Sequence, residues 1–244
     1  ICPRHSRHSA RALVASPPCP CERGERMPLG MHVAGLLVLW YSSSIVTSLT
    51  TKSILARFPF PIAVALVQQA VAACLSYMGW RYGADGAPAI LQLYRHSRAI
   101  APVAAVMVVS LVSYRWSLLS VSVSFTHTIK TLGPMFTIAF SRLLLNERLP
   151  ISHYVSVLPV VLGVAIATST EVEFALVGFV MAVASTVCQA VQNVLSKRVL
   201  AQGDVATPEL FCGAALAAFA LLLPLFLLLE AWRLSAVGAE AVGK

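Results

Sequence analysis

Residues 121–145 read VSVSFTHTIKTLGPMFTIAFSRLLL, an apolar run with Lys130 near its centre. As a helix, the run is long enough to cross a hydrocarbon layer of about 30 Å. Lys130 lies about ten residues, and therefore about 15 Å, from the start of the run. The stretch predicts a membrane-spanning helix with a positive charge buried near the middle of the bilayer.

Six further apolar runs accompany this one. The seven predicted spans cover residues 32–51, 60–80, 99–119, 121–145, 151–169, 174–195 and 208–230. Of the 244 residues, 58% are hydrophobic and 11% are charged, and the mean hydropathy is +0.79. Soluble domains carry about 25% charged residues. The predicted fold class is therefore all-α, a polytopic membrane helix bundle.

The net charge of +8 reports orientation in the membrane, because most cations lie in short segments between spans. If the N-terminus is in the cytoplasm, or in an equivalent compartment, twelve cations lie on that side of the membrane. They are Arg4, Arg7, Arg11, Arg23, Arg26, Arg81, Arg95, Arg98, Arg142, Arg148, Lys197 and Arg198. Nucleic-acid binding needs a solvated basic face, which this distribution lacks. We expect the lipid bilayer as a partner and no nucleic acid.

Residues 1–30 form a polar tail rich in Arg, Ser and Pro. Its composition is that of an organelle transit peptide, but Met27 and Met31 leave open that the tail is translated leader sequence. Cys19 and Cys21 have no downstream Cys or His at zinc spacing, so we expect no metal site.

A weak internal repeat relates two parts of the chain. Residues 50–55 (TTKSIL) resemble residues 195–200 (LSKRVL), five predicted spans later. An odd number of spans gives the two segments opposite orientations, as in inverted-repeat transporters. The prediction is a transporter membrane domain at 31–244, with a first five-helix repeat at about 31–170 and a partial second repeat at about 174–244. Two full repeats would have ten spans, so we expect the seven-span chain to be a fragment lacking about three.

Two cations fall inside the predicted spans, Arg115 and Lys130, and no Asp or Glu lies in the interior of any span. An anionic ligand would supply the missing negative charge. At helical spacing His127, Lys130 and Thr131 share a face, and Thr126 lies one turn before Lys130. These donors suit phosphate oxygens.

The same residues also have structural interpretations that involve no anion. Arg115 lies about 7 Å from the end of its span and could reach the interface. His127 could pack as a neutral residue between helices. Tyr114 and Trp116 are predicted to be interfacial belt residues. Pro134 frees a backbone carbonyl and predicts a kink near Lys130.

The string SVSFTHTIK at 122–130, followed by Pro134, resembles the triose-phosphate and sugar-phosphate translocator family of the drug/metabolite transporter superfamily. The resemblance covers about residues 31–230. It includes Lys52-Ser53-Ile54-Leu55, Phe58-Pro59-Phe60-Pro61, Leu158-Pro159 with Gly163, Thr170-Glu171 with Phe174 and Gly178, and residues 192–198. It implies ten helices in two inverted halves, exchange of phosphate or phosphorylated carbon compounds, and contact between Lys130 and the substrate phosphate.

Departures from the family pattern leave the substrate open. Plastid members usually have Glu where Gly133 stands, and His and Ser/Thr where Leu111 and Tyr114 stand. The family's Lys-Arg pair in the ninth helix would lie beyond residue 244. Members of the Golgi or endoplasmic reticulum match at least as well, so the expected location is a multi-pass protein of the Golgi/ER membrane or the plastid envelope.

The predicted function is antiport of a sugar phosphate or related organic phosphate, with inorganic phosphate as counter-substrate, by alternating access. Lys130 would be the main phosphate contact, supported by His127, Thr126 and Thr131, and Arg115 would attract the anion. The alternatives are a nucleotide-sugar transporter, a non-transporting incomplete family member and a seven-helix receptor. No cofactor is expected, and an enzyme is not, because no catalytic groups converge within the spans. The oligomeric state is open, a homodimer included.

Overall fold

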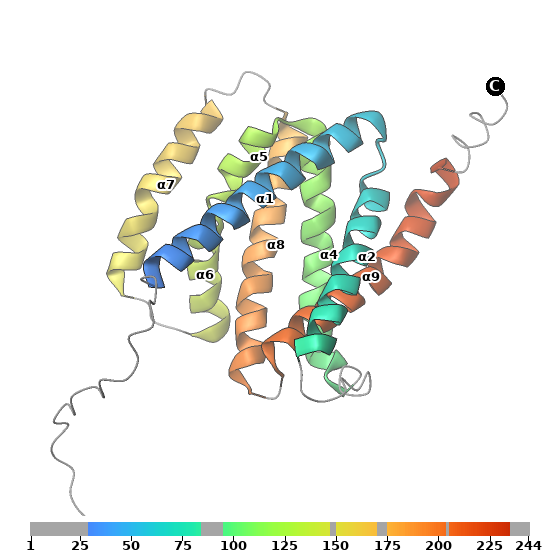
Figure 1. Cartoon of the computed structure of the whole chain (residues 1–244). Coiled ribbons are helices and arrows are strands. Elements are labelled where there is room, and N and C mark those ends of the chain that lie inside the picture. The colour runs from blue at the N-terminus through green and yellow to red at the C-terminus, as the bar shows by residue number, and fades with distance from the viewer. Residues whose placement is uncertain (1–28, 84–94, 147–149, 170–174, 204, 235–244) are drawn as a thin grey trace, which may run out of the picture. The chain divides into compact units, whose positions relative to one another are not determined.

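The computed structural model describes residues 29–83, 95–146, 150–169, 175–203 and 205–234, with side chains from residue 33 onward. These ranges contain helices and no strand, which confirms the predicted all-α class. The helices are α1 (Leu29–Arg57), α2 (Pro61–Gly83), α4 (Ser97–Ser120), α5 (Val123–Lys130), α6 (Gly133–Leu145), α7 (Ile151–Ser169), α8 (Leu176–Ala201) and α9 (Thr207–Leu229) (Figure 1). Most of the polar tail, residues 1–28, lies outside the described ranges.

The chain divides into two compact units within α1. The first unit, Ile1–Ile45, contributes the N-terminal part of α1, in which the rings of Trp40 and Tyr41 meet edge to face with centroids 5.1 Å apart. The second unit, Val46–Lys244, holds the rest of α1 and the other helices. All of the packing and the polar contacts that follow lie within the second unit.

Six described helices, α1, α2, α4, α7, α8 and α9, are long and apolar enough to cross a membrane. The predicted span at 121–145 is instead two shorter helices, α5 and α6, so the prediction of one continuous helix was wrong there. Pro134 has no N–H to bond the carbonyl of Lys130, and its ring crowds that carbonyl. The chain therefore turns at Thr131 and Leu132, where the Thr131 hydroxyl donates to Thr128 O at 2.6 Å. The kink predicted from Pro134 is a break in the helix.

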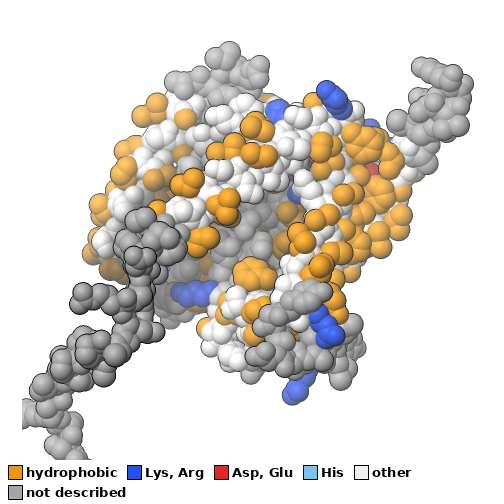
Figure 2. Space-filling view, in the orientation of Figure 1, with side chains coloured by type: hydrophobic (Ala, Val, Ile, Leu, Met, Phe, Trp, Pro, Cys, Tyr) orange, Lys and Arg blue, Asp and Glu red, His pale blue; other side chains and the backbone are white. Residues whose placement is uncertain are grey.

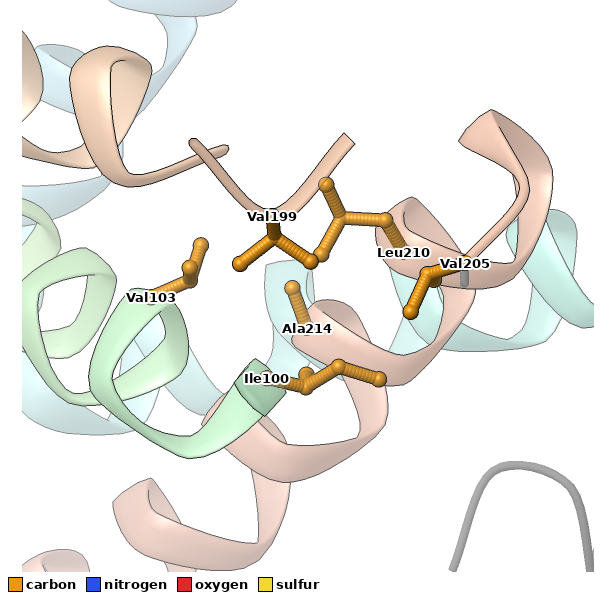
Figure 3. Packing of buried hydrophobic residues seen from close by; sticks show 6 residues of the cluster. All are labelled: Ile100, Val103, Val199, Val205, Leu210 and Ala214. Carbon is orange, nitrogen blue, oxygen red and sulfur yellow. The ribbon is translucent and has the colours of Figure 1, made fainter. Parts of the chain in front are cut away.

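In the second unit, α4 packs along α8 and α9, α2 along α9, and α6 along α8 (Figure 1). One buried apolar cluster joins the start of α4, the end of α8 and the start of α9 (Figure 3). Its members are Ile100, Val103, Val199, Val205, Leu210 and Ala214. Another cluster joins the end of α1, the start of α2 and the end of α4 through Leu55, Val64 and Leu118. The start of α2 and the end of α4 therefore lie at one end of the second unit, and the start of α4 and the end of α8 at the other.

We call the end near Ile100 and Val199 the basic end, because the following cations stand at the helix termini there: Arg81, Arg95, Arg98, Arg142, Lys197 and Arg198. The end near Leu55 and Leu118 is the opposite end. Figure 2 shows hydrophobic side chains over the visible flank of α2 and α9, with Lys and Arg mostly toward the two ends. Leu143, Leu228 and many other large apolar side chains are exposed in this way. A surface this apolar suits lipid contact, and the chain is an integral membrane protein.

Two details fix helices around the opposite end. The Glu230 carboxylate, just after α9, accepts hydrogen bonds from the backbone N–H groups of Ile62 (3.0 Å) and Ala63 (2.8 Å) and so caps the start of α2. Gly178 of α8 lies against the junction of α4 and α5. A Cβ at this glycine would come within 2.6 Å of Val121 Cγ1, so the close approach requires glycine.

Candidate anion-binding site

A group of polar side chains lies between α1, α2, α4 and α5, toward the opposite end of the second unit. We call it the polar cluster, and its members are Ser48, Thr51, Gln68, Tyr114, Arg115, His127 and Lys130. Ser48 and Thr51 are three residues apart in α1 and share one helix face, and both are buried. His127 and Lys130 are likewise three residues apart in α5. Each helix thus presents its polar residues one turn apart.

Lys130 lies over an aromatic ring. Its Nζ is 3.5 Å from the centroid of the Tyr114 ring, a cation–π contact between α5 and α4. The Tyr114 hydroxyl donates to Ser48 Oγ at 2.9 Å, and His127 Nε2 lies 3.0 Å from the same oxygen. Ser48 therefore joins α1 to both helices, and this network holds the Lys130 ammonium against the ring.

Arg115 turns away from the nearby helix end. Its Nη1 donates to Leu111 O at 3.0 Å, one turn back along α4, and its Nη2 donates to Gln68 Oε1 of α2. The Gln68 amide in turn donates to Thr51 Oγ1 at 3.0 Å. Arg115 is only 5% exposed, so the alternative of a side chain extended to the interface is wrong.

The hydroxyls of the two predicted threonines bond groups other than Lys130. Thr126 is fully buried, and its hydroxyl donates to Ser122 O at 3.1 Å and lies 3.2 Å from Ser117 Oγ. Thr131 is exposed, with its hydroxyl bonded to its own helix. Both lie close to Lys130 along the chain, and in the described part of the structure their hydroxyls bond Ser122, Ser117 and Thr128, which are not members of the polar cluster. Their roles in binding stay predictions.

Several members of the cluster were not predicted. Tyr114, predicted as a belt residue, instead places its ring beneath Lys130 and its hydroxyl on Ser48, so that prediction was wrong. Gln68 is an amide within an apolar span, and this polarity is a signal that the sequence offered. Lys52 Nζ donates to Val121 O, between α4 and α5, which adds a third cation near the cluster.

Negative charge is scarce around these cations. Among the described residues the carboxylates are Glu209 and Glu230 alone. Glu209 Oε1 lies 2.7 Å from His96 Nδ1 at the basic end, and Glu230 caps α2. The described part of the chain also has no group of His, Cys, Asp or Glu that could hold a metal ion. A buried Arg115 and a half-buried Lys130, both with neutral neighbours, form a candidate site for an anion.

Comparison with known sequences shows the family to which this helical membrane protein belongs. The model of the Triose-phosphate Transporter family matches residues 31–242. The chain belongs to this family, as the string at 122–130 predicted.

Named relatives are plastid translocators. The chain is 34% identical to phosphoenolpyruvate/phosphate translocator 3, chloroplastic, of Oryza sativa subsp. japonica, over 93% of this chain and 60% of the relative. It is 33% identical to the triose phosphate/phosphate translocator, chloroplastic, of Brassica oleracea var. botrytis, over 69% and 41%. A non-green plastid form from the same plant is 35% identical over 75% and 46%. The chain spans about half the length of these curated relatives.

Proposed function

We propose that the chain carries a phosphorylated organic compound across a membrane in exchange for inorganic phosphate. The observation that carries the proposal is the polar cluster itself, in which a buried Arg115 and a half-buried Lys130 have neutral partners. The relatives are translocators named for phosphate together with phosphoenolpyruvate or triose phosphate. An anionic phosphate would supply the negative charge that the cluster lacks.

Lys130 is the principal phosphate contact in this proposal. Its ammonium can give three hydrogen bonds, and the cation–π contact with Tyr114 leaves N–H groups for a ligand. His127 would add a donor from the same helix face, and Thr126 and Thr131 would support the phosphate after local rearrangement. The break between α5 and α6 follows Lys130 directly, and transporters commonly build substrate sites at such broken helices.

A groove along α8, lined in part by polar side chains, supports a route from this site to the basic end. Ala182 of α8 packs with Phe125 and Ile129 of α5, next to Lys130. Gln189 and Ser196 follow Ala182 at intervals of seven residues, so they lie on the same face of α8. There they line a pocket of about 620 Å³ with Gln192, Asn193, Lys197 and Phe211. Alternating access between the two ends would use this polar face of α8.

The named relatives favour phosphate exchange over nucleotide-sugar transport, and they favour the plastid envelope over the Golgi or endoplasmic reticulum. A measurement of transport would distinguish the proposed exchanger from a receptor, an enzyme or a family member that does not transport. An inverted repeat at 31–170 and 174–244 would provide the two states of the carrier.

Exchange of labelled phosphate by liposomes containing the purified chain tests the proposal. We expect saturable uptake into phosphate-loaded liposomes, and a loss of about 10- to 100-fold in Lys130→Gln, since a charge-assisted hydrogen bond disappears. Arg98→Gln is the matched control, because it removes one positive charge from an exposed position at the basic end. Equal uptake by Lys130→Gln and wild type would refute the site, and no uptake by well-folded wild type would refute the activity.

A further inference from the structure

Arg115 is a second cationic position that differs from Lys130 in surroundings and in shape. Its guanidinium lies on the α2 side of the cluster, next to Gln68, whereas the Lys130 ammonium lies over the Tyr114 ring. Tyr114 bonds Ser48, and Arg115 is joined through Gln68 to Thr51, so both positions border the same face of α1, on which Ser48 and Thr51 lie one turn apart. The Arg115 guanidinium is planar with several donors, whereas the Lys130 ammonium is a compact point charge.

The donors of Arg115 are incompletely used. Nη1 and Nη2 donate to the neutral oxygens of Leu111 and Gln68. Nε is buried and has no hydrogen-bond partner among the described residues. Nε and Nη2 lie along one edge of a guanidinium, the edge on which a carboxylate binds side-on with two hydrogen bonds. The Gln68 oxygen thus occupies one half of a carboxylate-binding edge, and the other half is unbonded.

No carboxylate of the described residues serves this edge. Glu209 is engaged with His96 at the basic end, and Glu230 is engaged with the start of α2. Burying a guanidinium without a negative partner is costly, so the arrangement favours a ligand that brings one. Since Lys130 is the proposed phosphate contact, a second anionic group on the same molecule would meet Arg115.

We propose that Arg115 binds the carboxylate of a phosphorylated carboxylic acid whose phosphate lies at Lys130. Phosphoenolpyruvate, which appears in the name of one relative, carries both a phosphate and a carboxylate. On binding, the carboxylate displaces the Gln68 oxygen from Nη2 and also accepts from Nε. This proposal rests on the proposed function, because it takes the phosphate position from Lys130. It makes Arg115 the residue that distinguishes phosphorylated acids from phosphate esters without a carboxylate.

Ligand binding by the purified chain in nanodiscs tests the proposal, with phosphoenolpyruvate, glycerol 3-phosphate and inorganic phosphate as probes. We expect Arg115→Gln to weaken phosphoenolpyruvate binding about 10- to 100-fold, as for loss of a bidentate charged pair. Glycerol 3-phosphate, which has no carboxylate, should change by less than about threefold. Arg98→Gln should leave the affinities of all three probes unchanged.

Gln68→Glu provides a second test that keeps Arg115 in place. The new carboxylate would stand where the Gln68 oxygen stands and would compete with that of the ligand. We expect the preference for phosphoenolpyruvate over glycerol 3-phosphate to disappear in this variant. A preference that persists in Gln68→Glu would overturn the proposal even if Arg115→Gln fails to fold.

The outcomes separate this proposal from the one on which it rests. An equal loss of both organic phosphates in Arg115→Gln would make Arg115 a second phosphate contact and overturn the carboxylate assignment, as would no loss at all. Lys130→Gln should weaken all three probes. If it leaves inorganic phosphate and glycerol 3-phosphate binding unchanged, the proposed phosphate site itself fails.

Discussion

Two charged side chains of the second unit, Glu230 and Arg115, are buried to the same extent, each 5% exposed, yet their partners differ. The Glu230 carboxylate accepts two backbone N–H groups at the start of α2, where the helix dipole also favours a negative charge. The Arg115 guanidinium bonds two neutral oxygens, and its Nε has no hydrogen-bond partner in the described ranges of the chain. A buried charge with structural partners stabilises the fold, whereas one that lacks a counter-charge is free to take a ligand.

Removing the Glu230 carboxylate should have the largest effect on stability. Glu230→Ala would leave the N–H groups of Ile62 and Ala63 unbonded and separate the start of α2 from the end of α9. We expect a loss of about 2–4 kcal/mol in the free energy of unfolding. Thermal unfolding in detergent micelles measures it, with the exposed neighbour variant Arg233→Ala as control. An unchanged midpoint would contradict the claim that the Glu230 carboxylate stabilises the fold.

A substitution at Gly178 tests whether α8 packs tightly against the junction of α4 and α5. Gly178→Ala would place Cβ 2.6 Å from Val121 Cγ1 and 2.9 Å from Ser120 Cβ, at the junction that leads into α5. We expect a loss of about 1–3 kcal/mol from overpacking. Gly163→Ala in α7 is the control, because no atom of the described residues lies within 4 Å of its added Cβ. Similar unfolding midpoints for the two variants would contradict the close packing of α8 on this junction.

Substitutions at Tyr114 test how much its ring contributes to phosphate binding by Lys130. Tyr114→Phe keeps the ring and loses only the hydrogen bond to Ser48, so phosphate affinity should change by less than about threefold. Tyr114→Leu also removes the cation–π contact, worth about 0.5–2 kcal/mol, and should weaken phosphate binding by about 3- to 10-fold. Binding isotherms of both variants give the comparison. Tighter binding in Tyr114→Leu would mean that the ring competes with the ligand for Lys130.

Much of the fold followed from local sequence. Apolar length alone placed the span at 151–169, which matches α7, and the span at 208–230, which is within one residue of α9 at both ends. The span at 121–145 failed because one proline removes a hydrogen bond that hydropathy does not register. Length and hydropathy predict that a segment lies in the membrane, but its backbone hydrogen bonds determine whether it forms one continuous helix.

The site was less predictable, because its geometry depends on contacts between helices. The polarity of Lys130 and Arg115 within apolar runs indicated the chemistry. Their neighbours Ser48 and Gln68 belong to other helices, 66 residues from Tyr114 and 47 residues from Arg115 along the chain. Helical spacing also grouped Thr131 with Lys130, but the turn that begins at Thr131 ends the periodicity on which that grouping depends.

The most direct test of the difference between Glu230 and Arg115 is the unfolding midpoint of two variants in phosphate-free micelles. Glu230→Gln keeps one acceptor and loses the charge, so its midpoint should fall below wild type. Arg115→Met removes a buried charge that has no negative partner among the described residues, and its stability should stay within about 1 kcal/mol of wild type or rise. A fall in Arg115→Met as large as that in Glu230→Gln would contradict the account, because Arg115 would then be a structural cation and not a ligand-binding one.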